Sequence, residues 1–315
     1  MKENKYVQEI VSVFNNHNND RYKCHELLQK ILKKAAADSL FLYDVIRHNL
    51  NSPEFIEKKR HYSTLALPVI ATPDFNIVIN IFPPLPDRTT NISFQSIHHH
   101  GNLLLTTAAL FGPGYESIVF KKNYTIDKES YLTKMEREKT YQFKQGVVEF
   151  IDKFQPHIVF YPESISATLA LWSNDQKTGM EAFKKFTLLQ KFKKPIKQLL
   201  KATGLSKSLQ LNEVSFFDFY PEKEKLYAMK DRLEYSFIGS NENFIQNIFH
   251  FIQQTGFNDN LFLSELKEKK FINLFTKQMI DKVLKGEQIK DEFIPQHLNV
   301  PKVNLLKDDI LKATR

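Results

Sequence analysis

Three consecutive histidines, His98, His99 and His100, are the residues of this chain best suited to chemistry. They end a run, Ile92–His100, that has the composition of a β-strand. Successive side chains on a strand point to opposite faces, so His98 and His100 are expected on one face and His99 on the other. Two neighbouring imidazoles on a strand supply half of a metal site, and His157 is the best candidate for a third ligand.

The identity of the metal that three histidines bind determines which reaction the site can catalyse. Neutral imidazole suits iron, zinc, copper and nickel, and three protein ligands leave positions open for a substrate, water or dioxygen. Iron(II) would activate dioxygen, whereas zinc would favour hydrolysis or isomerisation through bound hydroxide. Enzymes that use 2-oxoglutarate carry a carboxylate in the pattern His-x-Asp/Glu, and His100 stands at that position here. The pattern therefore disfavours a 2-oxoglutarate mechanism.

Three further residues are candidates for the surroundings of this site. Tyr161 has the strand parity of His157, which predicts a catalytic hydrogen bond to a substrate or an oxygen ligand. Asn102 has the parity of His100, and Glu116 follows a glycine turn, so both are candidates for contacting a ligand histidine or the substrate. Ordinary packing is the alternative for all three.

The elements that would position these residues are short strands. Turn residues separate strand-like runs over the whole middle of the chain. The runs are 63–71, 75–82, 92–100, 103–110, 116–120, 140–143, 146–150, 157–161 and 167–172. So many short strands in a little over a hundred residues favour a barrel or jelly roll over a parallel α/β sheet.

Helical periodicity marks the chain on both sides of this segment. Residues 1–50, Asn241–Thr255 and Phe271–Leu284 carry apolar residues at helical spacing, and helices are also expected in the region of residues 183–200. The last 25 residues contain Pro295 and Pro301 and are expected to be irregular. We expect an N-terminal helical segment (1–58), a β-barrel (59–175) and a C-terminal helical region (176–315).

The middle segment resembles the cupin superfamily of double-stranded β-helix barrels. His98-His99-His100 resembles the first cupin motif, and Gly112-Pro113-Gly114 the turn that follows it. The run from Gly146 to Asp152, followed by Pro156-His157, resembles the second motif. The usual glutamate after the first motif is absent, since Leu104 and Leu105 stand there, so the ligand set resembles that of three-histidine non-heme iron oxygenases.

This resemblance implies an α+β fold with a central cupin-like barrel. It implies a dioxygenase-like oxidoreductase that acts on a small molecule and dioxygen without 2-oxoglutarate, with iron(II) held by His98, His100 and His157. Zinc, nickel, manganese and copper stay open as metals. A zinc hydrolase or isomerase on the same site, and a non-catalytic cupin that binds a small ligand or interacts with a partner, stay open as functions.

Composition and charge bear on the cellular compartment and on the possible partners. The single cysteine, Cys24, fits a reducing compartment, and the charged start Met1–Lys5 precedes no apolar signal core, which together predict a cytoplasmic protein. The apolar runs are too short to cross a bilayer. The net charge of +8 is concentrated in the lysine-rich segment Lys177–Lys207, where a solvated helix face is favoured over a nucleic-acid arm. The sequence leaves a homodimer open.

Overall fold

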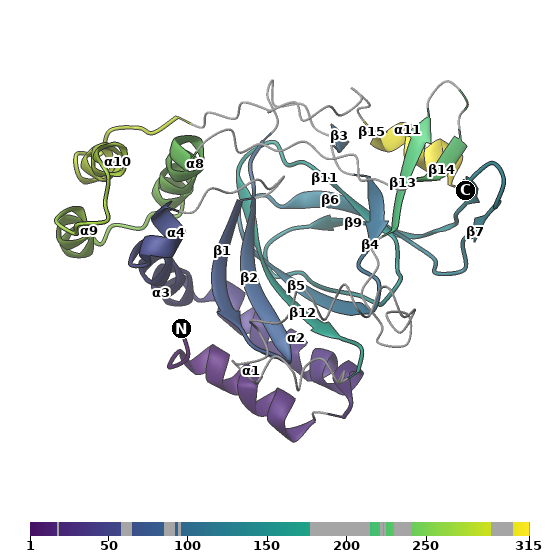
Figure 1. Cartoon of the computed structure of the whole chain (residues 1–315), viewed down its shortest axis with the longest axis horizontal. Helices are drawn as coiled ribbons and strands as arrows, with labels where there is room; N and C mark the ends of the chain where they lie inside the picture. The colour runs from purple at the N-terminus through teal and green to yellow at the C-terminus, as the bar shows by residue number, and fades with distance from the viewer. Residues whose placement is uncertain are drawn as a thin grey trace, which may run out of the picture.

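Apolar alternation in the middle of the chain builds two β-sheets that face each other (Figure 1). The structure is a computed structural model that describes residues 1–17, 19–57, 65–84, 92–93, 96–176, 215–220, 223, 225–229, 241–290 and 305–314. One sheet has the order β1-β2-β12-β5-β10 and the other the order β7-β8-β14-β13-β4-β11-β6-β9. Together they form the predicted α+β, cupin-like double-stranded β-helix.

The five-stranded sheet contains β1 (Leu65–Ala71), β2 (Phe75–Phe82), β5 (Leu103–Phe111), β10 (Val148–Ile151) and β12 (Ser166–Asn174). The eight-stranded sheet contains β4 (Ile97–His99), β6 (Tyr115–Phe120), β7 (Thr125–Ile126), β8 (Leu132–Lys134), β9 (Arg137–Phe143), β11 (His157–Phe160), β13 (Ser215–Tyr220) and β14 (Lys225–Met229). A separate pair joins β3 (Ile92–Ser93) to β15 (Leu305–Leu306). Neighbouring strands within the described sheets run antiparallel.

The central strands of each sheet bury both of their faces. The inner faces meet in the barrel, where Val119 of the eight-stranded sheet packs with Leu105 and Ala170 of the five-stranded sheet. The outer face of the five-stranded sheet packs Ile79 and Leu169 against the helices. The outer face of the eight-stranded sheet is covered by α11 (Lys307–Ala313). Burial of both faces fixes the register, because a slip of one residue would exchange them.

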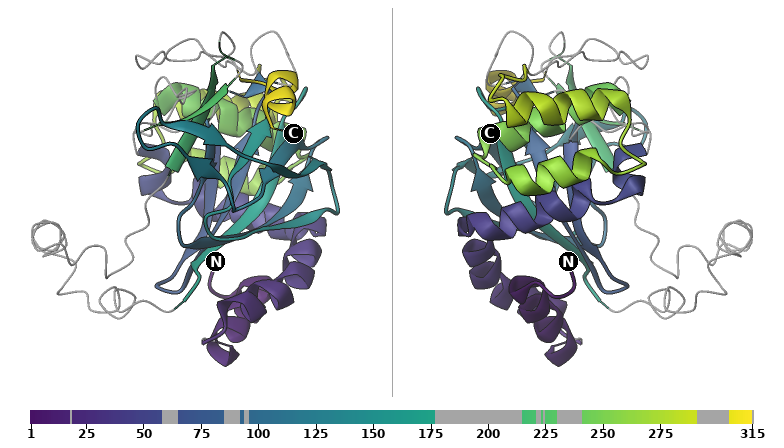
Figure 2. Two further views of the ribbon diagram at one scale, coloured as in Figure 1. Left: turned by 90° about the vertical axis from the view of Figure 1, so that its right-hand side faces the viewer. Right: turned by 90° about the vertical axis from the view of Figure 1, so that its left-hand side faces the viewer.

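The helices from both ends of the chain form one layer on the five-stranded sheet (Figure 2). The N-terminal members are α1 (Lys5–Asn16), α2 (Arg21–Ala37), α3 (Ser39–Leu50) and α4 (Pro53–Glu57), and the C-terminal members are α8 (Asn241–Gln254), α9 (Asn260–Lys267) and α10 (Leu274–Leu284). Side-chain oxygens of Asn4, Asp20 and Asp38 cap α1, α2 and α3. These helices include those predicted over residues 1–50, Asn241–Thr255 and Phe271–Leu284, and α4 and α9 add to them.

The barrel draws on more of the chain than the sequence pattern indicated. Strands β13 and β14 come from beyond residue 175, and β13 pairs with β4, so the boundary expected there is not the end of the sheet. The tail expected to be irregular contains β15 and α11, because Ile310 is buried against the outer face of the eight-stranded sheet. The helices expected at residues 183–200 and the basic segment 177–207 lie outside the described residues.

The turn between β5 and β6 depends on glycine at two positions. Gly112 and Gly114 have φ values of +80° and +79°, a region that side chains with a Cβ rarely adopt. A Cβ on Gly114 would lie 1.6 Å from the carbonyl oxygen of Phe143, which is not possible without moving β9. By contrast, Gly146 has a φ of +86° but no atom within 4 Å of the Cβ position.

Gly114 and Gly146 give a matched test of the close approach between the turn and β9. Gly146→Ala should lower the free energy of unfolding by about 1–2 kcal/mol, the cost of the left-handed backbone alone. Gly114→Ala adds the collision with the Phe143 carbonyl and should cost several times more or prevent folding. Urea unfolding of both variants measures the difference, and equal losses would contradict the close approach of the two strands.

A buried histidine joins the helical layer to the sheet. The Nδ1 atom of His25 on α2 lies 2.7 Å from the Thr106 hydroxyl, and its Nε2 atom lies 2.9 Å from the Ser173 hydroxyl. Burial lowers the pKa of His25 to about 3, with a smaller contribution from the nearby Arg21 charge. The imidazole is therefore neutral in the folded protein at neutral pH.

This pKa predicts acid sensitivity with a defined sign. Between about pH 6.5 and pH 3 the unfolded state binds the His25 proton and the folded state does not, so stability falls as the pH falls through this window. In His25→Gln the slope of unfolding free energy against pH should be smaller by up to about 1.4 kcal/mol per pH unit. Urea unfolding at several pH values tests this, with His17→Gln as the control. An unchanged slope would contradict it.

Candidate metal centre

Two of the predicted ligands come from neighbouring strands. Strand β11 pairs with β4, and His157 stands directly opposite His98 in the antiparallel register. Residues so paired have their side chains on the same face of the sheet. The ring centroids of His98 and His157 are 4.7 Å apart, and both side chains are buried. His157 also pairs with Val119 of β6, which places the two histidines on the inner face of the barrel.

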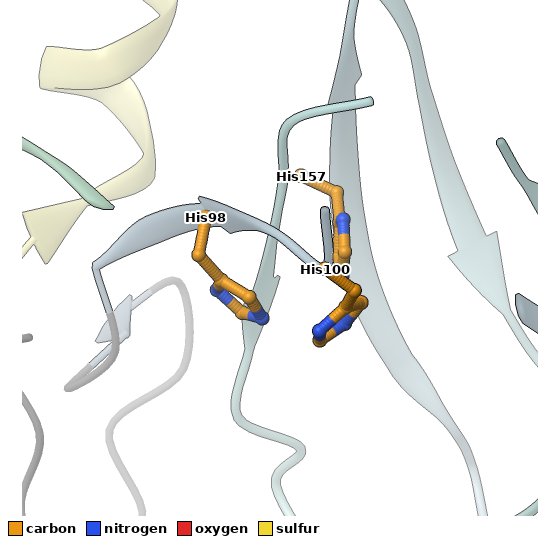
Figure 3. Close-up of side chains that lie close together, drawn as sticks. All are labelled: His98, His100 and His157. Carbon is orange, nitrogen blue, oxygen red and sulfur yellow. The ribbon is translucent and has the colours of Figure 1, made fainter. Parts of the chain in front are cut away.

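The third histidine joins them from the end of β4. His100 lies just beyond the strand, where its carbonyl oxygen accepts a hydrogen bond from the Leu103 amide across a turn. Gly101 allows this turn, since its φ is +60°. The His100 ring centroid is 4.9 Å from that of His98 and 5.0 Å from that of His157. Figure 3 shows the three rings pointing toward one space.

The geometry fits a metal ion. One ligand nitrogen from each histidine lies within 4.8 Å of the other two. Three nitrogens bound facially or tetrahedrally to one ion at about 2.1 Å lie roughly 3.0–3.4 Å apart, so a separation at the upper limit here would have to shorten by roughly 1.4 Å on metal binding. Among the described residues this is the one group of three histidine, cysteine or carboxylate side chains arranged in this way.

Backbone carbonyls orient two of the rings. The Nδ1 atom of His98 lies 2.9 Å from the Ser96 carbonyl oxygen, and the Nδ1 atom of His157 lies 3.2 Å from that of Gln155. In a neutral ring, an Nδ1–H that donates to a carbonyl puts the lone pair on Nε2, the arrangement typical of metal-binding histidines. Burial lowers the pKa of His157 to about 4, although the Gln155 carbonyl opposes the shift. This histidine is therefore neutral at neutral pH, as a ligand must be.

His99 faces the other way, as the strand parity predicts. Its ring lies on the outer face of the eight-stranded sheet, called the outer core below, and packs against Phe154 and Phe217 at centroid distances of 5.4 and 6.3 Å. Its Nδ1 atom accepts a hydrogen bond from the Gly101 amide, and burial lowers its pKa to about 4. His99 thus supports the turn that carries His100.

The structure does not bring the other predicted residues into this cluster. Tyr161 is buried and shares the face of His157, but it lies four residues farther along, about 13 Å at the usual strand rise, where its ring is 6.5 Å from that of Phe82. Asn102 lies in the turn after Gly101, and its carbonyl accepts from the Asp175 amide.

Glu116 lies on the outer face of the barrel. It pairs in register with Phe160, whose side chain belongs to the outer core, and its carboxylate accepts a hydrogen bond of 2.6 Å from Lys307 of α11. The parity of β6, on which Val119 faces inward, explains this position. The structure therefore places Glu116 with α11 and away from the ligand histidines.

One neighbour of the cluster was missed from the sequence. Phe216 on β13 pairs with His98, and the two ring centroids are 6.4 Å apart. The aromatic run Ser215–Tyr220 has the composition of a strand and could have been identified as one, but its pairing with β4 could not. No described helix has the length and apolar character needed to cross a bilayer.

Comparisons with known proteins show a similarity of fold and give no information about activity. No family model and no curated protein matches the sequence. A cupin superfamily protein from Desulfitobacterium hafniense matches with 10% identity and a TM-score of 0.24, over 37% of this chain and 83% of that one. A protein with a double-stranded β-helix domain from Klebsiella pneumoniae matches with 12% identity and a TM-score of 0.24, over 39% and 88%.

A third structure, the DMSP lyase DddQ from Ruegeria pomeroyi, has 11% identity and a TM-score of 0.24. The match covers 37% of this chain and spans about half, 49%, of the lyase. Likenesses of this size carry no argument about activity. The cupin-like fold is identified from the arrangement of the chain's own strands.

Substitutions at the cluster test its affinity for metal. His98→Ala and His157→Ala should each weaken binding of iron(II) or zinc at least about 100-fold, since each removes one of three ligands. His17→Gln is the matched control, because it changes a histidine at the end of α1, outside the cluster, and should retain the metal. Elemental analysis after chelation and reloading gives the stoichiometry. Equal metal content in all variants would contradict the site.

Proposed function

We propose that the protein is a non-heme iron oxygenase that acts on a small molecule with dioxygen and does not use 2-oxoglutarate. The observation that carries the proposal is the cluster of His98, His100 and His157 on the inner face of a cupin-like barrel. Its donors are three imidazoles without a carboxylate. Such a set suits iron(II) and would leave coordination positions open for dioxygen and a substrate.

The chain's residues prepare this site in two ways. The Ser96 and Gln155 carbonyls hold the rings of His98 and His157 in one orientation, so little rearrangement accompanies binding. Apolar side chains around Val119, which packs with Leu105 and Ala170, exclude water from the adjoining interior. Bound iron(II) would supply the electrons and open positions for dioxygen and the substrate.

Tyr161 and Asn102 stay proposed as contacts of the substrate. Tyr161 is buried on the face of the barrel that carries His157, and its distance along the strand favours the far end of a substrate over the metal. Asn102 is half-buried in the turn that follows His100. Neither residue is needed to hold the metal.

Zinc is the alternative with specific support. Its usual ligand set of three protein donors and one open position equally suits three histidines, and it would favour hydrolysis or isomerisation. A barrel that binds a small ligand without catalysis would need no metal. The metal content of the purified protein separates these functions.

A metal measurement combined with nitric oxide tests the oxygenase. Protein purified without a histidine tag and loaded anaerobically should hold roughly one iron per chain. Nitric oxide, a surrogate for dioxygen, should then give the electron paramagnetic resonance signal of a high-spin iron nitrosyl, which His157→Ala should lack. Stoichiometric zinc that iron does not displace would favour the hydrolase. Protein that binds neither metal would favour the non-catalytic module.

A further inference from the structure

One row of side chains crosses the inner face of the eight-stranded sheet through the histidine cluster. The register aligns Phe216 with His98, His98 with His157, His157 with Val119, and Val119 with Lys139 of β9. Lys139 is two strands from His157, or about 10 Å at the usual strand spacing. Its long side chain can therefore reach a molecule bound at the cluster.

The contacts of Lys139 place its ammonium group inside the barrel. It forms an ion pair with Glu149 of β10, which belongs to the opposite sheet, and its Nζ atom lies 5.3 Å from the centre of the Tyr141 ring. Glu149 has the parity of Ile151, an inward-facing residue. The ion pair therefore bridges the two sheets across the interior.

This ion pair is open to a ligand. The Lys139 side chain keeps 39% of its surface exposed and that of Glu149 keeps 19%. Ion pairs with this much exposure contribute little to stability, so cohesion of the barrel does not account for charged groups here. An ammonium has three donors, and one partner does not use them all. On the described inner faces of β2, β4–β6 and β9–β12, the register places two fully charged side chains, Lys139 and Glu149.

The charge of the loaded interior sets the class of ligand. Lys139 and Glu149 cancel, and metal-binding histidines are neutral, so a divalent ion at the cluster would leave the interior with a net charge of about +2. A carboxylate in the ligand set would have reduced this charge, and the cluster has none. In a partly desolvated barrel such a charge favours an anionic ligand.

We propose that the substrate is a small carboxylate, and that Lys139 binds a carboxylate group of it while the reacting end lies at the three histidines. This proposal rests on the metal site of the proposed function. Glu149 restrains Lys139 in the empty barrel and weakens its attraction for anions. Lys139 is thus a binding residue that selects the substrate by charge.

Zinc-loaded protein allows a test without turnover. Acetate is too short to contact the metal and Lys139 at once, so its affinity for the metal is measured alone, whereas glutarate can reach from the metal to Lys139. Calorimetric titration should show that Lys139→Gln weakens glutarate binding at least about tenfold and leaves acetate binding within about twofold. Lys139→Arg should restore most of the affinity. Lys121→Gln is the control, because it breaks an exposed ion pair with Glu136 on the surface.

Glu149→Gln gives a result of the opposite sign. Without the competing carboxylate, glutarate should bind about fivefold more tightly or better. A purely structural ion pair would make both variants less stable and leave glutarate affinity unchanged, which would overturn the proposal. If Lys139→Gln does not fold, the glutarate affinity of Glu149→Gln tests the proposal by itself. Tighter glutarate binding supports the proposal, and unchanged binding overturns it.

The experiment distinguishes an error in the proposed metal site from an error in the proposed carboxylate-binding role of Lys139. Zinc and acetate binding with glutarate affinity independent of Lys139 would overturn the carboxylate site and leave the metal centre standing. Protein that binds neither zinc nor iron(II) would overturn the metal centre and with it this proposal.

Discussion

The register between β4 and β11 is the constraint on which the site depends. It sets His157 opposite His98, and a shift of one residue would turn one of the two imidazoles to the outer face. Both faces of these strands are buried in different surroundings, so a shift would also turn either Ile97 or Ile158 from the outer face of the sheet to the inner face. The packing of the outer core thus holds the inward histidines in place.

The turns reinforce this register. Gly101 reverses the chain directly after His100, and His99 accepts a hydrogen bond from its amide. The histidine that faces away from the cluster therefore stabilises the turn that presents its neighbour. At the other end of the barrel, Gly114 permits an approach to β9 that no residue with a Cβ could make. Structural residues and the clustered histidines are interleaved along the same few strands.

The helices that pack on the outer faces of the two sheets come from different parts of the chain. Helices from both ends of the chain cover the five-stranded sheet, and α11 covers the eight-stranded sheet. Lys307 of α11 binds Glu116 on the outer face, directly behind the barrel interior. The described inner faces carry the three histidines, apolar and uncharged polar side chains, and the ion pair of Lys139 with Glu149. This separation explains how a basic chain can contain a barrel with so few charges.

The sequence alone determined most strands of the middle segment, the helices at residues 1–50, 241–255 and 271–284, and the group of three histidines, because alternation and local turn chemistry depend on near neighbours in the chain. It missed β7 and β8, which are short and have no apolar alternation. It also determined that His99 faces away from His98. It did not determine the pairing of β13 with β4 or the position of Glu116, since strand order depends on contacts between distant residues. Only the tertiary structure brought Phe216 and Lys139 into the row of the histidines, because a register between strands is decided by packing of whole sheets and not by the sequence of any one strand.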